Sequence, residues 1–195
     1  MIIFVQIRFM KLSKVNIYSF LMLVIIAAAY RAIPGRPWGF APQFAMAIFS
    51  GAIVKDKKWA LAFPVLSLLI SDILYQLFYV AGVYNIPGFY NGMIGNYILF
   101  GSLTIIGFFT NASKLSSIAK SSFAAPTAFF IISNFMVWMG NGGYQRPKTM
   151  TGLMQVYYDG LPFYANSILA TVVFGVLLFG ANELIKKYVH SAATN

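Results

Sequence analysis

The hydrophobic positions of the chain fall into six long apolar runs separated by short polar segments. A helix needs about 17–25 mostly apolar residues to cross roughly 30 Å of hydrocarbon. These runs lack the alternation of barrel strands, and only helices or closed barrels satisfy backbone polar groups in lipid. The pattern predicts an all-α membrane protein: a compact bundle of six transmembrane helices in one integral membrane domain, residues 1–195. We expect spans at about residues 15–33, 38–54, 59–80, 93–110, 123–139 and 161–185.

The basic residues lie mainly in alternate connections between these runs. If the N-terminus is cytoplasmic, ten of the 14 Lys and Arg residues fall on the inner side and four on the outer side. Cytoplasmic segments of membrane proteins are enriched in Lys and Arg, so the asymmetry predicts that both termini are cytoplasmic. The same residues explain the net charge of +10 through attraction to anionic headgroups, and we expect no nucleic-acid partner. The outer four are Arg31, Arg36, Arg146 and Lys148.

The first apolar run also resembles a signal peptide, because Arg8, Lys11 and Lys14 precede it and it ends in "AAAY". The run is longer than a signal peptide requires, and the six-span topology balances only if the run stays. Retention is therefore the favoured interpretation.

Composition agrees with a membrane protein and excludes several chemistries. Hydrophobic residues make up 59% of the chain, against about 45–50% in globular proteins. The chain has no cysteine and a single histidine, His190, which excludes disulfides, thiolate catalysis and a multi-histidine metal site. Its four acidic residues are far apart in sequence, and no Ser-His-Asp set is recognisable. We therefore expect no enzyme activity, no cofactor and no metal.

The predicted outer connections hold most of the irregular sequence. The last one, residues 140–160, is long and crowded with Gly and Tyr, and we expect Pro162 to start the final helix. Irregular segments on one face are typical of a binding cavity open to that side. The many aromatic residues in these connections fit either a pocket wall or an interfacial belt, since Trp and Tyr favour the membrane surface.

Asp72 is the one carboxylate that the pattern places deep inside a span. A charged side chain at that depth costs several kcal/mol on its own, so it usually faces a partner or a cavity. Gln76 lies one helical turn further on and extends a polar stripe toward the outer surface. Two interpretations stay open: an interhelical ion pair with Arg31 or Arg36, or a contact with a ligand.

Asn134 and Asn166 place carboxamides within the fifth and sixth runs, where they suit either helix association or substrate recognition. The last outer connection, which lies between these two runs, adds aromatic rings and the cation of Arg146. Ring faces, amides and a cation together are the mix expected for a planar, polar metabolite, with the connection acting as a lid. The candidate substrate-binding residues are Asp72, Gln76, Asn134, Trp138, Tyr144, Arg146, Tyr157 and Asn166.

Several blocks resemble a family of uncharacterised bacterial transport membrane proteins that is similar to the substrate-binding S components of energy-coupling factor (ECF) vitamin transporters. The blocks are "RPWGFAPQFAMAIFSGA", "LLISDILYQL", "SNFMVW", "GGYQRPKTMTGLMQVYYDGLPF" and "NSILATVVFGVLLFG", within residues 36–180. Thr171 stands where an acidic residue is common in that family, so no role of such a carboxylate is carried over.

The resemblance implies a subunit of the bacterial cytoplasmic (inner) membrane that captures a small vitamin-type or related metabolite for uptake. A transmembrane scaffold and two cytoplasmic ATPases from other chains would drive release. Small residues on the first two helices would meet that scaffold, or would serve internal packing. The alternative is a non-transporting accessory or assembly subunit of a larger membrane complex, with the outer aromatic connections holding a partner protein. A self-sufficient transporter or channel is a third interpretation.

Overall fold

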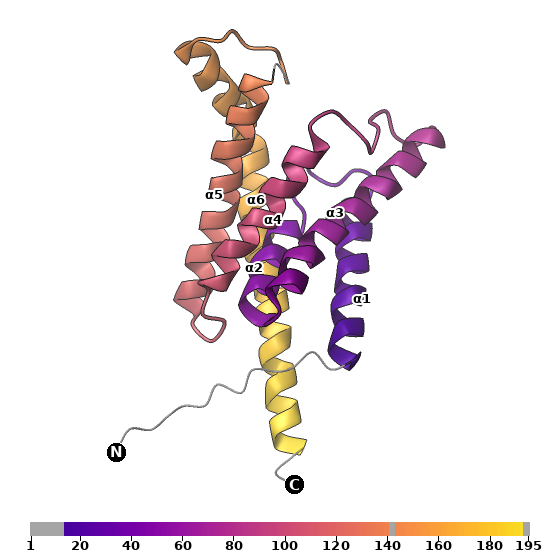
Figure 1. Ribbon diagram of the computed structural model, residues 1–195, viewed down its shortest axis with the longest axis vertical. Helices are drawn as coiled ribbons and strands as arrows, with labels where there is room; N and C mark the ends of the chain where they lie inside the picture. Colours follow the sequence, from indigo (N-terminus) through magenta and orange to yellow (C-terminus); the bar gives the residue numbers. More distant parts are fainter. Residues whose placement is uncertain (1–13, 141–142, 193–195) are drawn as a thin grey trace.

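The computed structural model describes residues 14–140 and 143–192, and these ranges form six helices without a strand (Figure 1). The prediction of an all-helical chain is therefore confirmed. Predictions that involve Arg8, Lys11 and the side chain of His190 lie outside the described part. The helices are α1 (Lys14–Arg31), α2 (Gln43–Ile53), α3 (Lys57–Val80), α4 (Met93–Phe108), α5 (Leu115–Met139) and α6 (Met150–Ala192).

Helix α2 lies at the centre of the bundle and packs against α3, α4, α5 and α6. Its residues 43–51 are all buried. Two glycines allow α2 and α4 to approach closely: a Cβ on Gly51 would collide with the Thr104 carbonyl oxygen, and one on Gly107 with the Ile48 carbonyl oxygen. Small residues at such crossings are typical of helix packing in membranes, where close backbone contact replaces the hydrophobic driving force.

Three helices are long and apolar enough to cross a membrane, which indicates a membrane protein. They are α3, α5 and the Met150–Lys187 part of α6. The other apolar helical segments with described side chains are shorter, and α2 has only 11 residues. At 1.5 Å per residue α2 is about 16 Å long, which is less than the roughly 30 Å of a hydrocarbon core. The six-span topology and the cytoplasmic placement of both termini stay predictions.

The start of α6 differs from the expected one. The helix begins at Met150 rather than near Leu161, and Pro162 lies inside it, so the expected irregular connection of about twenty residues is wrong. The Thr149 hydroxyl accepts a hydrogen bond from the Gly152 N–H at 3.1 Å and caps the helix. Gly152 also lets this first turn pack against the Pro147 carbonyl, where a Cβ would collide. Proline is tolerated within membrane helices because neighbouring groups satisfy the freed backbone atoms.

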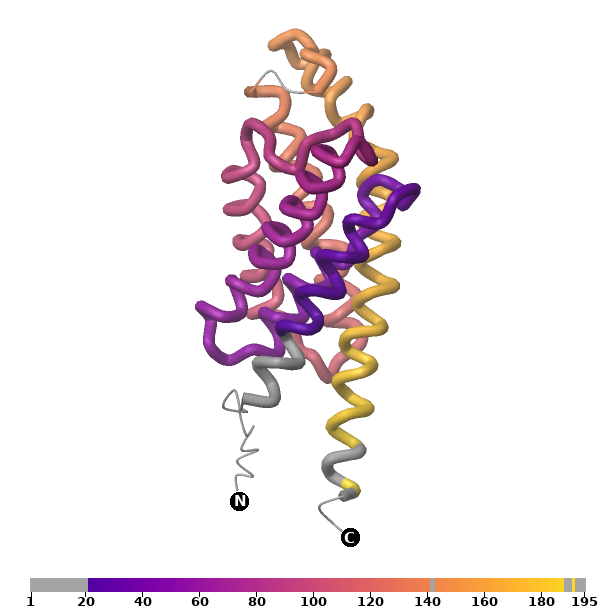
Figure 2. Tube along the Cα trace, turned by 90° about the vertical axis from the view of Figure 1, so that its right-hand side faces the viewer, coloured from indigo at the N-terminus to yellow at the C-terminus, as the bar shows by residue number. Residues whose placement is uncertain are grey.

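The connections are divided between the two ends of the molecule. The α2–α3 and α4–α5 connections lie at the same end as the start of α1 and the end of α6, while the α1–α2, α3–α4 and α5–α6 connections lie at the other (Figures 1 and 2). The former end carries Lys55, Lys57, Lys58, Lys114, Lys120, Lys186 and Lys187. We call it the basic end.

Candidate functional site

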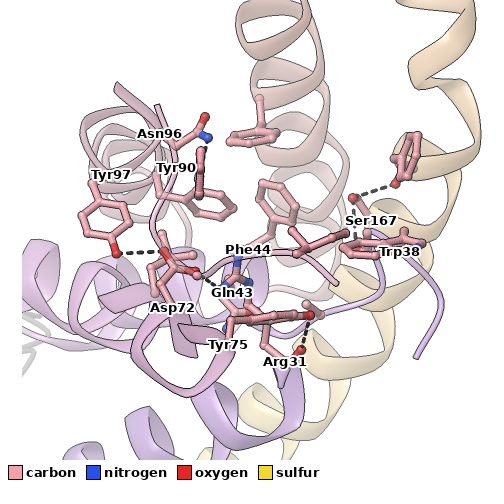
Figure 3. A pocket seen from close by; sticks show the side chains of 18 of the residues that line it. Arg31, Trp38, Gln43, Phe44, Asp72, Tyr75, Tyr90, Asn96, Tyr97 and Ser167 are labelled. Atoms are coloured by element: carbon pink, nitrogen blue, oxygen red, sulfur yellow. Dashed lines mark hydrogen bonds and ion pairs between the residues drawn. The ribbon is translucent and has the colours of Figure 1, made fainter. Parts of the chain in front are cut away.

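A pocket of about 330 Å³ lies between the α1–α2 and α3–α4 connections, which are at the end opposite to the basic end (Figure 1). Figure 3 shows side chains that line it. Each of the six helices contributes to its wall. An open, ligand-sized cavity with apolar walls and a few convergent polar groups is the usual form of a small-molecule site. Its lining includes Arg31, Arg36, Trp38, Gln43, Phe44, Asp72, Tyr75, Ile86, Tyr90, Asn96, Tyr97, Phe100, Phe129, Phe163 and Ser167.

Asp72 on α3 lies on the floor of this pocket and is 2% exposed. Arg31, the last residue of α1, pairs with its Oδ1 at 2.5 Å, and the Tyr97 hydroxyl of α4 donates to its Oδ2 at 2.8 Å. A buried carboxylate is stable only when such partners compensate its lost hydration. The ion-pair interpretation is therefore the one that the structure displays, with Arg31 as the partner, although Asp72 also faces the pocket.

Tyr75 connects this ion pair to the rim. Its hydroxyl donates to the Arg31 carbonyl oxygen at 3.0 Å, and its ring lies 5.3 Å from the Arg31 guanidinium carbon. The same ring stacks on Tyr84 of the α3–α4 connection, with the centroids 5.0 Å apart. The Tyr84 hydroxyl donates to the Ala32 carbonyl oxygen at 2.7 Å, and burial raises the pKa of Tyr84. These contacts tie the end of α1 to the α3–α4 connection.

Three phenylalanines from different helices form the apolar wall. Phe44 of α2 lies 4.8 Å from Phe100 of α4 and 5.2 Å from Phe129 of α5, measured between ring centroids, and Phe100 and Phe129 are 4.7 Å apart. Such ring clusters favour edge and offset contacts with another aromatic ring. The wall therefore suits a ligand with a flat apolar body.

Gln76 holds the wall of the pocket in place. Its Oε1 accepts from the backbone N–H groups of Gly88 and Phe89, at 3.1 and 3.3 Å. Gly88 sits so close to α3 that a Cβ there would collide with the Asp72 carbonyl oxygen. Gln76 was predicted to bind substrate, and the structure places it behind the α3–α4 connection that lines the pocket.

Asn166 has a comparable position on the other side. Its Nδ2 donates to the Trp38 carbonyl oxygen at 2.8 Å. Ser167 Oγ lies 2.8 Å from the Phe163 carbonyl oxygen and 3.2 Å from the Gly39 carbonyl oxygen, and it can donate to either. Gly39 has a positive φ of 83°, and a Cβ there would collide with the Phe163 carbonyl oxygen. The α1–α2 connection is thus fixed onto α6, so that Trp38 lines the pocket.

Asn134 lines a neighbouring cavity of about 200 Å³ between α5 and α6. Its Nδ2 donates to the Phe130 carbonyl oxygen at 2.8 Å, one turn earlier in α5. This cavity shares Phe129, Phe163 and Ser167 with the larger pocket. Asn134 is therefore adjacent to the pocket that contains Asp72, on the far side of the shared residues.

The remaining predicted residues gather at the α5–α6 turn, away from the lining of the pocket that contains Asp72. Arg146 forms two hydrogen bonds with the Asp159 carboxylate, at 2.9 and 3.1 Å, which raise the pKa of Arg146. The Tyr144 ring lies 5.3 Å from the Arg146 guanidinium carbon. Trp138 Nε1 donates to the Pro147 carbonyl oxygen at 3.0 Å, and the Tyr157 hydroxyl donates to the Ile131 carbonyl oxygen at 2.9 Å. These contacts brace the turn itself.

Of the polar residues that line the pocket, only Asp72 was among the predicted site residues, and Arg36 and Gln43 are two of those that were missed. Arg36 was considered only as a topology signal and as a partner for Asp72. Gln43 is 2% exposed, and its Nε2 donates to the Ala27 carbonyl oxygen at 3.3 Å while its Oε1 has no hydrogen-bond partner. A lone Gln inside the second apolar run was the available signal for this residue.

No group of three His, Cys, Asp or Glu side chains in the described part of the chain could hold a metal ion. What the pocket offers is binding chemistry: the Arg31–Asp72 ion pair, a second arginine, Arg36, and aromatic walls.

Fold and site together define a helical membrane protein with an open pocket of ligand size at the end opposite to its basic residues. The chain belongs to the family described as "Family of unknown function (DUF6580)", whose model matches residues 11–193. No curated protein and no solved structure matches the chain.

Proposed function

We propose that this chain is a substrate-binding subunit, similar to an ECF S component, that captures a small metabolite at the outer face of the bacterial cytoplasmic membrane. The observation that carries the proposal is the pocket in which all six helices meet around Asp72 and the three phenylalanines. Its volume of about 330 Å³ suits a vitamin-type or related molecule.

The direction of the pocket follows from charge. Lys residues crowd the opposite end of the bundle, and the positive-inside rule assigns that end to the cytoplasm. With six spans and both termini inside, the pocket opens outward, where a nutrient would be captured. Helix α2 would then be a short internal span, kept from lipid by the four helices around it.

Uptake by such a subunit requires energy from other chains. No phosphate-binding loop is recognisable in the sequence, so a transmembrane scaffold and two ATPases would supply nucleotide hydrolysis. The sequence resemblance to S-component-like proteins supports this division of labour. The proposal does not include catalysis by the chain itself.

Native mass spectrometry of the full chain, purified from its own host in mild detergent, tests the proposal. We expect a bound small molecule that disappears in Ala41→Trp, because Ala41 lines the pocket and the indole would fill it. Ala29→Trp is the matched control, since Ala29 is exposed on α1. Both variants must elute as folded protein. A bound molecule that persists in Ala41→Trp, or none in wild type, would contradict the proposal.

One observation favours the alternative of an accessory or assembly subunit. Helix α6 has 43 residues and is about 65 Å long, whereas a bilayer with its headgroups is about 40–45 Å thick. The part of α6 beyond the pocket end exposes Met150, Met154 and Tyr158, which are four residues apart and so share one face. An apolar face outside the bilayer would need a partner protein. The same mass spectra would reveal a large complex without ATPases.

A further inference from the structure

Arg36 is a cation without an acidic partner in this chain. The chain has four Asp and Glu residues, all within the described part, and each is engaged elsewhere. Asp56 caps α3 by accepting from the Lys58 N–H. The other three form ion pairs: Asp72 with Arg31, Asp159 with Arg146, and Glu183 with Lys186.

The Arg36 guanidinium is well hydrogen-bonded through Nε and Nη1 but only weakly through Nη2. Its Nε donates to the Arg31 carbonyl oxygen at 3.2 Å, and its Nη1 donates to the carbonyl oxygens of Pro37 and Phe40. Its Nη2 has only the Tyr75 hydroxyl, at 3.5 Å, which is the long limit for a hydrogen bond. Because a guanidinium has five N–H donors, Nη2 can still donate to a ligand.

Arg36 also lies at the entrance. It lines both the pocket and an adjoining cavity of about 470 Å³ formed with the α3–α4 connection. The side chain is half-buried, so part of its hydration is already lost. Any molecule that fills the pocket would remove more water from this charge. Within the pocket, the negative charge of Asp72 compensates the positive charge of Arg31, whereas no acidic side chain compensates the charge of Arg36.

We propose that the pocket is selective for a monoanion: a small molecule with a flat apolar body whose carboxylate or phosphodiester group binds Arg36. Arginine suits this task because its guanidinium stays charged and its Nη2 can donate a charge-assisted hydrogen bond to an oxygen of such a group. The phenylalanine wall would hold the body of the ligand, while Asp72 stays with Arg31. The proposal rests on the proposed function for placing the ligand in this pocket.

The same oxyanion could come from a free small acid or from a lipid headgroup of the outer leaflet. Both would use the Nη2 edge of Arg36, but they differ in the apolar part that follows the anion. A compact ring system fits inside the pocket, whereas acyl chains must lead out through its opening. A test therefore needs one probe of each kind.

The test uses the full chain in the neutral detergent dodecyl maltoside, with binding measured by isothermal titration calorimetry. The probes are 2-naphthoate and 2-naphthamide, which share a ring system and differ in charge, and the short-chain lipid dihexanoyl phosphatidylglycerol. We expect naphthoate to bind at least tenfold more tightly than naphthamide. Arg36→Gln should abolish this preference and Arg36→Lys should retain part of it. Lys148→Gln, which removes an exposed outer charge, should leave it unchanged.

The outcomes separate the possibilities. An Arg36-dependent preference for naphthoate supports a small acid as ligand, and Arg36-dependent binding of the lipid alone supports the anion site with a headgroup as its occupant. If neither naphthoate nor the lipid binds in an Arg36-dependent way, the inference is overturned. Melting curves verify folding, and Arg36→Lys keeps the test valid if Arg36→Gln unfolds. A native ligand lost in Ala41→Trp but indifferent to Arg36→Gln would refute the anion while leaving the proposed function intact.

Discussion

Replacing Asp72 by Asn removes one charge from the buried ion pair with almost no change of shape. The carboxylate is 2% exposed and its partner Arg31 is 22% exposed, so the arginine loses its counter-ion but can still reach water through the pocket. Removing one partner of a fully buried pair costs about 3–5 kcal/mol, and the partial exposure of Arg31 lowers our expectation to about 2–3 kcal/mol. For a chain of this size that corresponds to a fall of roughly 4–12 °C in melting temperature.

A double-mutant cycle shows whether the loss comes from the pair. Arg31→Met should also destabilise the protein, because it leaves Asp72 buried with only Tyr97 as donor. The variant with both changes should lose about 2 kcal/mol less than the sum of the single losses, since neither charge is left alone. The free energy of unfolding is measured by titration of mixed micelles with a denaturing detergent. Losses that add to within about 0.5 kcal/mol would refute the reasoning, because independent sites behave that way.

Three other predictions concern the connections that frame the pocket and the topology of the chain. Gly88→Ala should weaken binding of the native ligand and lower the melting temperature, because a methyl group would push the α3–α4 connection off α3. The control is Gly180→Ala, which meets no atom within 4 Å and should leave binding unchanged without lowering the melting temperature. Asn166→Ala should cost about 1 kcal/mol and reduce ligand affinity, since it frees the Trp38 carbonyl group; unchanged calorimetric affinity would count against a fixed α1–α2 connection. A phosphatase reporter fused after Lys187 should be inactive because that end is predicted to be cytoplasmic, and an active fusion would reverse the topology.

The helices were predictable because the apolar runs are long and polar segments separate one run from the next. The lone carboxylate in the third run was likewise sufficient to predict that Asp72 faces a partner or a ligand, and the structure shows Arg31 as the partner. The start of α6 was not predictable from the sequence, because Gly and Pro, which stand at positions 160 and 162, usually interrupt helices in water-soluble proteins. Here Gly160 packs against the Asn134 side chain, and Pro162 continues within the helix.

The site was harder to predict than the fold, because its parts come from distant segments. The Asn166 side chain meets the Trp38 backbone across 128 residues of sequence, and a single sequence contains no signal for such a pairing. Because residues 140–160 are rich in Gly and aromatic residues, much of the predicted site was placed at the α5–α6 turn. Arg36 stands in a four-residue "PGRP" segment that looks like a plain connection, and its importance emerges only when the partners of all four acidic residues are known.

The Arg31 backbone links the buried ion pair to the proposed anion site. Its carbonyl oxygen accepts from both Arg36 Nε and the Tyr75 hydroxyl, while its own guanidinium holds Asp72. A ligand anion that draws Arg36 toward the pocket would therefore act on the last turn of α1, and through Tyr75 on α3. Asp72→Asn leaves the Arg31 guanidinium without its counter-ion at the same pocket. The variant should therefore bind naphthoate more tightly relative to naphthamide, although Asp72 itself makes no contact with the anion. An equal change in the binding of both probes would mean that Asp72 supports only the shape of the pocket.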